Sequence, residues 1–386
     1  MIVTGGGTAG HVTPLLAVVT ELHKRHPEVQ IRYIGQYGDS MQNIVKEQGN
    51  IDRRYRILAG KWRRYHGLSV VGHLADIKTL AKNFRDAVLF TLGYVQSIFI
   101  LLFWRPKVVF AKGGFVCLPV GLAAATLRIP VITHDSDSIP GLTNRILSRF
   151  ARLQATGMPT TFYKDFYQLE KLRYTGIPVM ADFDNVASDT FKHQSRLFFK
   201  IPNDAKVVAV IGGSLGAVRL NDAILANLRS LTDDYINLIW VTGAKQYKEL
   251  VEKSGQLVER KAFLKMFAFS SDMPKIIAAA DIVISRAGAT SIAELALAAK
   301  PVILVPSPYL VGGHQVKNAV NLEKSNAVIV VTEHQIEKDA SIVGNTVGSL
   351  FSDESKRAEL SKNIYKLAVK DASAKIADVI EEVLAK

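Results

Sequence analysis

The sequence predicts an α/β protein made of two doubly wound domains, each built on a parallel sheet. Short β-branched runs alternate with longer amphipathic runs along the 386 residues, which is the βαβ pattern of parallel sheets. A glycine-rich turn at residues 5–11 follows the first apolar run, and another at 212–217 follows an apolar run in the second half. Each turn brings the backbone and a helix N-terminus close to an anion.

The expected strands come in a regular order. In the first half they lie at residues 1–3, 31–34, 108–110 and 130–133, and in the second half at 207–211, 238–241, 282–284 and 301–305. Helical patterns separate them, for example at 292–299, and the tail from 352 to 386 is expected to form one or two helices. Ligands bind at the carboxyl ends of such strands, so the residues that follow them are the candidates for chemistry.

The boundary between the domains is expected at the Thr-Gly-Ile-Pro segment, residues 175–178. The residues from there to 204 are polar and weakly periodic, which predicts a linker and a surface entry into the second domain. The domains are therefore expected at 1–175 and 176–364, and a last helix at about 365–386 is expected to pack back on the first domain.

Composition limits the function classes. A net charge of +13 favours a phosphorylated substrate or an anionic membrane, although a basic surface that serves solubility explains it equally well. Nucleic acid is not an expected partner, since no zinc knuckle, aromatic-glycine RNA signature or helix-turn-helix pattern occurs. The single cysteine, Cys117, excludes a disulfide framework and favours a reducing cytoplasm. We expect no signal peptide, because the first residues are a strand followed by glycines.

Residues 87–104 form an almost wholly apolar stretch between Arg85 and Arg105. Its length is marginal for a membrane span, which needs about 20 residues. Two interpretations remain open: a helix buried against the sheet, or a helix whose exposed apolar face enters a bilayer surface. The second is favoured by residues that anionic headgroups attract, namely the aromatic Phe99, Phe103 and Trp104 and the upstream Lys61, Arg63 and Arg64. A solvated loop is the simpler interpretation of those three basic residues.

An ordered set of motifs resembles the MurG family. The matching segments are GGTAGH at 6–11 with Pro14, GGF at 113–115, HDSD at 134–137 with PGLTN at 140–144, TGIPV at 175–179, GSLGA at 213–217, SRAGA at 285–289 with Glu294, and HQ at 314–315 with Asn318. One glycine loop would mean little, whereas this set spans nearly the whole chain. The resemblance implies the GT-B fold: two Rossmann-like, doubly wound parallel-sheet domains that face each other across a cleft.

The resemblance also implies an activity. It implies an inverting glycosyltransferase that moves N-acetylglucosamine from UDP-N-acetylglucosamine to the muramyl 4-hydroxyl of undecaprenyl-pyrophosphoryl-N-acetylmuramyl-pentapeptide, which converts lipid I to lipid II in peptidoglycan synthesis. Such a protein is peripheral, lies at the cytoplasmic face of the bacterial cell membrane and binds its acceptor with the first domain and UDP-sugar with the second. No cofactor and no metal are expected.

Inverting transfer needs a base for the acceptor hydroxyl and groups that stabilise the leaving diphosphate. His11 is the candidate base, because neutral imidazole titrates near physiological pH; a role that only orients the loop or the acceptor is the alternative. The resemblance places the acceptor on the two glycine turns of the first domain and on one histidine: Gly6, Gly7, Thr8, Ala9, Gly113, Gly114 and His134.

The donor is expected mainly on the second domain. Loop amides and a helix N-terminus hold the diphosphate, and the resemblance assigns the ribose hydroxyls to Glu294 and the uracil to Phe269 and Ser270. A carboxylate that favours the start of its own helix is the alternative for Glu294. The full predicted donor set is Thr8, Gly10, Asn144, Gly213, Ser214, Leu215, Gly216, Phe269, Ser270, Arg286, Gly288, Ala289, Thr290, Glu294, His314, Gln315 and Asn318.

Some features oppose or qualify this assignment. Asp135-Ser136-Asp137 is a D-x-D, which chelates manganese in another fold class, but it lies in the first domain, away from the expected donor site. Ala9 replaces a frequent glycine of the family, and Met180 stands where a basic residue is frequent.

Four other functions remain open. They are a transferase that acts on another lipid such as diacylglycerol, a UDP-N-acetylglucosamine epimerase, a nicotinamide or flavin oxidoreductase, and a non-catalytic membrane scaffold. The oxidoreductase needs an acidic residue directly after the second strand, where Asp39 lies too far along. The scaffold has no need of Glu294, His314, Gln315 and Asn318.

Overall fold

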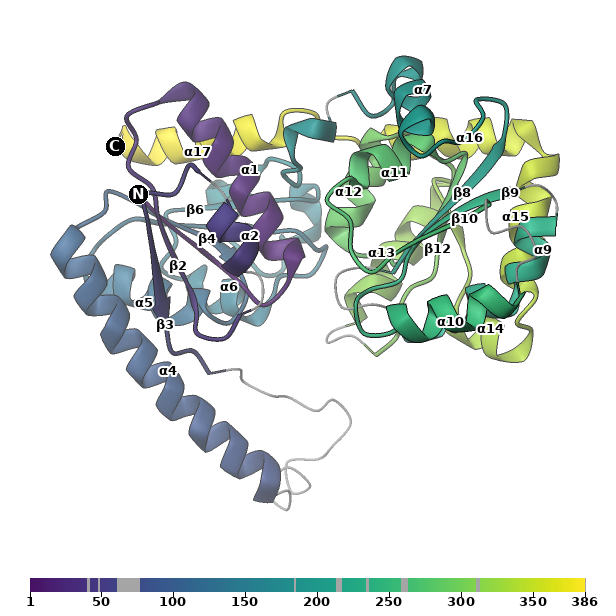
Figure 1. Cartoon of the computed structure of the whole chain (residues 1–386). Helices are drawn as coiled ribbons and strands as arrows, with labels where there is room; N and C mark the ends of the chain where they lie inside the picture. Colours follow the sequence, from purple (N-terminus) through teal and green to yellow (C-terminus); the bar gives the residue numbers. More distant parts are fainter. Residues whose placement is uncertain are drawn as a thin grey trace. The chain divides into compact units, whose positions relative to one another are not determined.

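The computed structural model describes residues 1–39, 42–47, 49–60, 77–183, 185–212, 217–233, 236–257, 263–309 and 313–385. They form two compact units, one of Met1–Met180 with Asp371–Lys386 and one of Ala181–Lys370. Each unit is a parallel sheet between helices (Figure 1), which confirms the predicted class of two doubly wound domains. The chain changes unit after Met180, and its last helix belongs to the first unit.

The described residues of the first unit form a seven-stranded sheet of order β3-β2-β1-β4-β5-β6-β7. The order reverses between β1 and β4, and such a reversal opens a crevice at the carboxyl ends of these strands. The strands are β1 Ile2–Gly5, β2 Arg32–Gln36, β3 Arg53–Ile57, β4 Val109–Gly113, β5 Val131–Asp135, β6 Leu153–Thr156 and β7 Leu172–Tyr174. The helices are α1 Ala9–Arg25, α2 Gln42–Glu47, α4 Ile77–Trp104, α5 Cys117–Thr126, α6 Leu142–Leu147 and α17 Ala372–Leu384, with 3-10 turns at Thr160–Phe162 and Leu169–Lys171.

The described residues of the second unit form a six-stranded sheet of order β10-β9-β8-β11-β12-β13, with the reversal between β8 and β11. The strands are β8 Lys206–Ile211, β9 Ile236–Val241, β10 Leu264–Phe267, β11 Ile282–Ser285, β12 Val302–Leu304 and β13 Ile329–Val330. The helices are α7 Asp189–Phe198, α8 Val218–Ala226, α9 Leu228–Asp233, α10 Tyr247–Leu257, α11 Met273–Ala279, α12 Ala289–Leu297, α13 His314–Lys324, α14 Glu333–Lys338, α15 Ile342–Ser352 and α16 Glu354–Tyr365, with a 3-10 turn at Ala181–Phe183.

The central strands are buried on both faces, which explains why they are continuous β-branched runs in the sequence. Successive side chains of a strand point to opposite faces. Val3 and Phe110 therefore pack with α1 and α17, whereas the preceding residues Ile2 and Val109 pack with α4 and α5. Two apolar cores, one on each face of the sheet, hold the first unit together.

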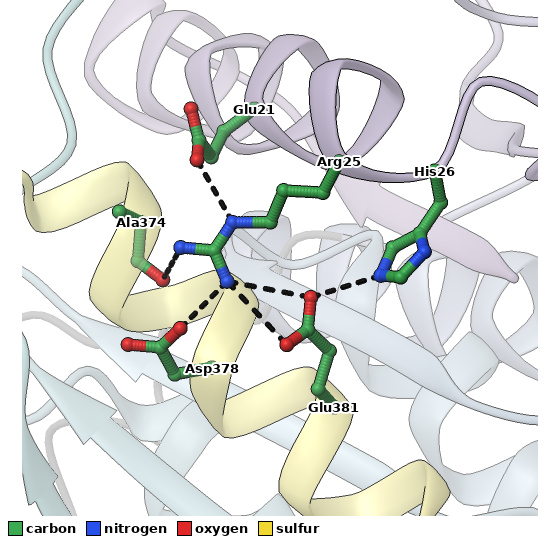
Figure 2. Close-up of polar contacts among 6 residues, drawn as sticks. All are labelled: Glu21, Arg25, His26, Ala374, Asp378 and Glu381. Atoms are coloured by element: carbon green, nitrogen blue, oxygen red, sulfur yellow. Dashed lines mark hydrogen bonds and ion pairs between the residues drawn. The ribbon is translucent and has the colours of Figure 1, made fainter.

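An ion-pair cluster joins the last helix to the first (Figure 2). Arg25 of α1 contacts Glu21 at 2.8 Å, Asp378 of α17 at 2.6 Å and Glu381 of α17 at 3.3 Å. Its guanidinium also donates to the Ala374 carbonyl at 3.1 Å. Hydrogen bonds, first of all the one to Asp378, raise the pKa of Arg25. The cluster fixes α17 on the surface of α1, above the shared apolar core.

We expect Arg25→Met to loosen α17 without unfolding the sheet. One guanidinium holds three carboxylates, so the variant should lose about 1–2 kcal/mol of local stability, more than an isolated surface pair provides. Hydrogen exchange of the α17 amides measures this opening. Lys253→Met is the control, because it removes the exposed pair with Glu249 at 2.6 Å and should leave α17 protection unchanged. Equal protection of α17 in both variants would contradict the role of Arg25.

The segment predicted as a linker contains a helix, so that part of the prediction is wrong. The Ser188 hydroxyl accepts from the Phe191 amide and caps α7. Arg196 of α7 is 2% exposed and contacts Asp281 at 2.8 Å. The side of α7 that packs on the second unit therefore carries a paired charge at a position where a core-facing helix usually has an apolar residue.

The apolar stretch forms α4, which begins at Ile77 and is longer than predicted. Large apolar side chains are exposed at helical spacing, and we call them the α4 apolar face: Phe84, Val88, Leu92, Val95, Phe99, Leu102 and Phe103. The opposite side is buried, since Leu101 is inaccessible and a methyl group on Gly93 would collide with the Leu58 carbonyl.

The structure combines parts of both interpretations: one side of α4 packs on the core of the first unit, and the other side exposes apolar residues. The segment Lys82–Trp104 is long and apolar enough to cross a membrane by length and composition, and 17% of it is buried. Trp104 differs from Phe99 and Phe103, with which the sequence groups it: it is half-buried, and the Arg32 guanidinium lies 4.2 Å from its ring centroid.

Candidate active site

Two glycine turns of the first unit touch at the crevice between β1 and β4. Gly7, Gly113 and Gly114 have φ angles of 87°, 122° and 89°, a region that favours glycine. A methyl group on Gly114 would come within 2.5 Å of the Gly6 carbonyl oxygen. The turn after β1 and the turn after β4 therefore form one continuous backbone surface, which only glycines at these positions permit.

His11 lies in the first turn of α1, over this surface. Its Nδ1 is 3.0 Å from the Gly6 carbonyl oxygen and 3.3 Å from Thr8 Oγ1. A neutral ring that donates Nδ1–H to Gly6 keeps a lone pair on Nε2. A methyl group on Gly113 would lie 3.4 Å from Nε2, so Nε2 faces the turn after β4.

The surroundings of His11 favour the neutral ring. Burial, followed by the charge of Lys112, lowers the pKa of His11, while the hydrogen bond to Gly6 opposes this shift. A neutral imidazole at neutral pH accepts a proton on Nε2, which is the property of a general base.

Buried polar side chains support the two glycine turns from the interior of the first unit. The Asn144 amide nitrogen donates to the His134 carbonyl at 2.9 Å and to Asp135 Oδ1 at 3.0 Å. The Tyr167 hydroxyl donates to Asp135 Oδ2 at 2.7 Å. Burial raises the pKa of Asp135 to about 6. Both carboxylate oxygens of Asp135 are thus engaged inside the unit, and none of the described residues form a His, Cys, Asp and Glu group suited to a metal ion.

His134 lies deeper than a ligand-binding residue is expected to lie. It is fully buried, and its Nε2 is 2.9 Å from the Gly176 carbonyl oxygen. In this conformation the ring therefore holds the segment after β7 instead of facing a ligand. His134 Nδ1, Thr133 Oγ1 and Asn144 Oδ1 are buried without a hydrogen-bond partner among the residues the structure describes.

The second unit presents a helix N-terminus at its own crevice. Gly288 is the N-cap of α12, which follows β11, and no described side chain caps the helix there. A methyl group on Gly288 would meet only Ser291 Oγ, at 3.9 Å. The N-terminus of α12 thus has open space at its N-cap position and no side-chain cap, and a helix N-terminus is a position where an anion is stabilised.

Glu294 lies on α12 just after these amides. It is half-buried, and burial raises the pKa of its carboxyl to about 7. No hydrogen bond to this carboxyl comes from the described residues. Partial removal from water makes the ionised carboxyl costly, and a pair of ligand hydroxyls would stabilise it by hydrogen bonds.

The predicted sugar-reading residues lie on α13. Gln315 Oε1 accepts from the Ser307 amide at 2.9 Å, and Asn318 donates to the Ala287 carbonyl at 3.3 Å. His314 Nδ1 is buried without a partner among described residues. These bonds connect α13 to the ends of β11 and β12, strands that pair side by side. Before β11, Phe269 is 63% exposed, and Ser270 Oγ accepts from the Asp272 amide.

Arg286 forms an internal ion pair that the sequence did not indicate. Its guanidinium contacts the buried Glu333 at 2.7 Å and donates to the Val305 carbonyl at 2.9 Å. Glu333 also contacts Arg219 at 3.2 Å. This geometry connects β11, β12 and α14, and it gives no support to direct donor binding by Arg286.

The remaining predicted residues divide as follows. Thr8, Gly10 and Asn144, assigned to the donor, lie in the first unit. Gly213, Ser214, Leu215 and Gly216 lie outside the described residues, as do Lys61, Arg63 and Arg64. Sequence reasoning missed Lys112, a buried lysine directly before Gly113; the available signal was a lysine inside an otherwise apolar strand.

Comparison with known proteins gives consistent matches over the whole chain. Models described as the Glycosyltransferase family 28 N-terminal and C-terminal domains match residues 1–156 and 207–378. The chain is 34% identical over 382 residues to a UDP-N-acetylglucosamine–N-acetylmuramyl-(pentapeptide) pyrophosphoryl-undecaprenol N-acetylglucosamine transferase of Listeria monocytogenes serovar 1/2a, with 99% of each chain covered. It is 30% identical to the protein of that name from Acetivibrio thermocellus, over 100% of this chain and 98% of the relative.

Solved structures show the same architecture. The MurG structure of Acinetobacter baumannii matches with a TM-score of 0.69 at 23% identity, over 99% of both chains. A UDP-GlcNAc 2-epimerase from Neisseria meningitidis bound to UDP-GlcNAc matches with a TM-score of 0.67 at 14% identity, also over 99% of both. At these identities the matches show a shared fold.

Proposed function

The chain belongs to the MurG family, and we propose that His11 is the base of the reaction it catalyses. That reaction is the N-acetylglucosaminyl transfer of peptidoglycan synthesis that converts lipid I to lipid II. The observation that carries the proposal is the 3.0 Å contact between His11 Nδ1 and the Gly6 carbonyl oxygen, beside two glycine turns. A neutral ring that donates Nδ1–H in this contact has a free lone pair on Nε2.

The proposed step is a single displacement. The muramyl 4-hydroxyl proton passes to His11 Nε2 while its oxygen forms a bond to C1 of N-acetylglucosamine. The bond between C1 and the UDP oxygen breaks, and UDP leaves with the electron pair. One displacement inverts the anomeric centre. Amides of the α12 N-terminus, and of the predicted turn at Gly213–Gly216, stabilise the charge that develops on the diphosphate.

We assign the acceptor to the glycine turns of the first unit: Gly6, Gly7, Thr8, Ala9, Gly113 and Gly114. The Gly7 amide donates to Asp39 Oδ2 at 2.8 Å, so an acceptor phosphate that uses this amide has to displace the Asp39 carboxylate. His134 supports this surface from the interior.

We assign the ribose hydroxyls of the donor to Glu294, the uracil to Phe269 and Ser270, and the sugar to His314, Gln315 and Asn318. The diphosphate lies at Gly288, Ala289 and Thr290. Thr8 and Gly10 are the proposed donor contacts from the first unit. Asn144, which is 3% exposed and donates to His134 and Asp135, supports the glycine turns from the interior. Arg286 acts through Glu333 and the end of β12, where it keeps the start of α12 in place.

An acceptor panel tests the activity. The full chain is mixed in detergent with labelled UDP-N-acetylglucosamine and, in separate arms, synthetic lipid-linked muramyl-pentapeptide, diacylglycerol or no acceptor. We expect a lipid-linked disaccharide in the first arm only. Label on diacylglycerol alone, or free UDP-N-acetylmannosamine without acceptor, would replace this function with one of the two alternatives.

We also propose that the protein is peripheral to the cytoplasmic face of the cell membrane, bound through the α4 apolar face. Phe103 and Phe99 are 89% and 55% exposed, and an apolar helix face with nearby positive charge suits an anionic bilayer surface. Arg53, Arg54 and Arg56 are exposed on the neighbouring β3. Lys61, Arg63 and Arg64 remain predicted contacts of lipid phosphates.

We expect Phe99→Ser with Phe103→Ser to weaken binding to phosphatidylglycerol vesicles at least about tenfold, because burying each phenyl ring contributes about 1.5–3 kcal/mol. Sedimentation with vesicles measures the partition. Leu197→Ser is the control, since Leu197 is 71% exposed on α7 of the other unit. Identical partition of the double variant and the control would rule out the α4 apolar face.

A further inference from the structure

Lys112 is a buried cation that the proposed reaction does not yet use. It is the penultimate residue of β4 and is 1% exposed. Its Nζ donates to Ser136 Oγ at 2.6 Å. Burial lowers the pKa of Lys112 to about 8, against the opposing charges of Asp135 and Asp137. Because burying a charge is costly, and Lys112 follows the buried apolar run Val109, Phe110 and Ala111 of the same strand, packing alone does not explain a lysine here.

Lys112 belongs to the cluster that surrounds His11. It directly precedes Gly113, and a methyl group on Gly113 would lie 3.3 Å from the His11 ring. On the other side, a methyl group on Gly5 would lie 3.5 Å from both Lys112 Cβ and the His11 carbonyl oxygen. The β1–β4 pairing, with Gly5 opposite Gly113, thus sets Lys112 beside the first turn of α1, where the half-buried His11 lies.

The charges that face His11 come from several elements. Lys112 on β4 lowers the pKa of His11, whereas Asp137, after β5, and Asp39, after β2, raise it. His134 of β5 adds no positive charge, because burial first, then Lys112, holds its own pKa well below the usual value. Asp135 of β5 faces Lys112. Lys112 is thus the cation that opposes two carboxylates at His11.

We propose that Lys112 is a positioning residue for His11: its buried ammonium, held by Ser136, opposes a second positive charge on the imidazole and keeps Nε2 able to take the acceptor proton. The inference rests on the proposed role of His11 as base. Lys112 stays charged throughout the titration of His11, because its pKa of about 8 lies above that of His11. After transfer, the same repulsion favours release of the proton from His11.

The test measures the protonation of His11 directly. The full chain is labelled at the histidine rings, the His11 signals are assigned with His11→Asn, and their pH titration is followed by NMR. In Lys112→Met and Lys112→Gln we expect the His11 pKa to rise by about one unit, and the acid limb of kcat to move to higher pH with it. Lys112→Arg keeps the charge and should restore both values.

Two features keep the test decisive. Gln retains a hydrogen-bond donor for Ser136, so it covers the case in which Met prevents folding. Lys300→Met is the matched control, because Lys300 is a lysine of the second unit that is 9% exposed and donates to the Ala278 carbonyl at 2.9 Å; it should leave the His11 titration unchanged.

The outcomes separate this inference from the function on which it rests. If Lys112→Met or Lys112→Gln is folded and its His11 pKa equals that of the wild type, the inference is overturned. The NMR titration needs no turnover, so a failure of His11 as base appears separately, as full activity of His11→Asn.

Discussion

His11→Ala is expected to lower kcat for transfer by about 10²–10⁴, the usual contribution of a general base, with the affinity for UDP unchanged. The reason is that we propose Nε2 as the atom that takes the acceptor proton, whereas the donor contacts are assigned mainly to the second unit. Steady-state kinetics with the muramyl lipid, together with calorimetric titration of UDP, measure both quantities.

The pH dependence of the wild-type enzyme has a defined sign. Burial and Lys112 lower the pKa of His11 from its ordinary value of 6.5, so the ring is neutral at pH 7. The kcat of the wild-type enzyme should be level at neutral pH and fall only as pH decreases through the lowered pKa of His11.

His23→Ala is the control for His11→Ala, because His23 lies on the same helix and outside the cluster. This variant should keep wild-type kcat. A loss in His11→Ala confined to the KM for the acceptor would instead assign His11 to orientation.

Glu294→Gln is expected to weaken UDP binding about ten- to a hundredfold. Hydrogen bonds to a charged group contribute about 1.5–3 kcal/mol, and each 1.4 kcal/mol is a factor of ten. The amide keeps the shape of the side chain but loses the charge and one acceptor. The protein should remain folded, because no described residue hydrogen-bonds to this carboxyl, and removing a half-buried acid relieves a desolvation cost.

Calorimetric titration of UDP tests this expectation, with Glu323→Gln as the control on the exposed side of α13. Unchanged UDP affinity in Glu294→Gln, with a shift in thermal stability alone, would show that Glu294 only supports its own helix.

The sequence predicted the buried strands better than the edges of the sheets. The strands β1, β4, β5, β8 and β11 are covered on both faces, and burial requires the β-branched runs by which they were recognised. The edge strand β3 has the opposite pattern, because Arg53, Arg54 and Arg56 lie on exposed positions. The helix α7 was missed for a related reason: its buried Arg196 is paired with Asp281, and that partner lies far away in sequence.

In the candidate site, too, some features were predictable from the sequence and others were not. His11 and the glycine turns were predictable, because a base and close-approaching backbone need those residue types at the ends of strands. Lys112 was not, since its effect on His11 depends on the register that sets β4 beside β1. Arg286 is predicted from the sequence as a donor ligand, and the structure adds an ion pair with Glu333 of α14, a helix distant in sequence. Long-range pairing of charges is the information that local sequence patterns lack.

The central claim is that His11 Nε2 takes the acceptor proton, and the single-turnover rate of His11→Asn tests it most directly. The Asn amide nitrogen can replace Nδ1–H as the donor to the Gly6 carbonyl, at 3.0 Å in the wild type, but it provides no base. With saturating donor and lipid acceptor, the account predicts a transfer rate at least about a hundredfold below wild type. A rate within a few-fold of wild type would contradict it and leave His11 as a residue that orders the turn.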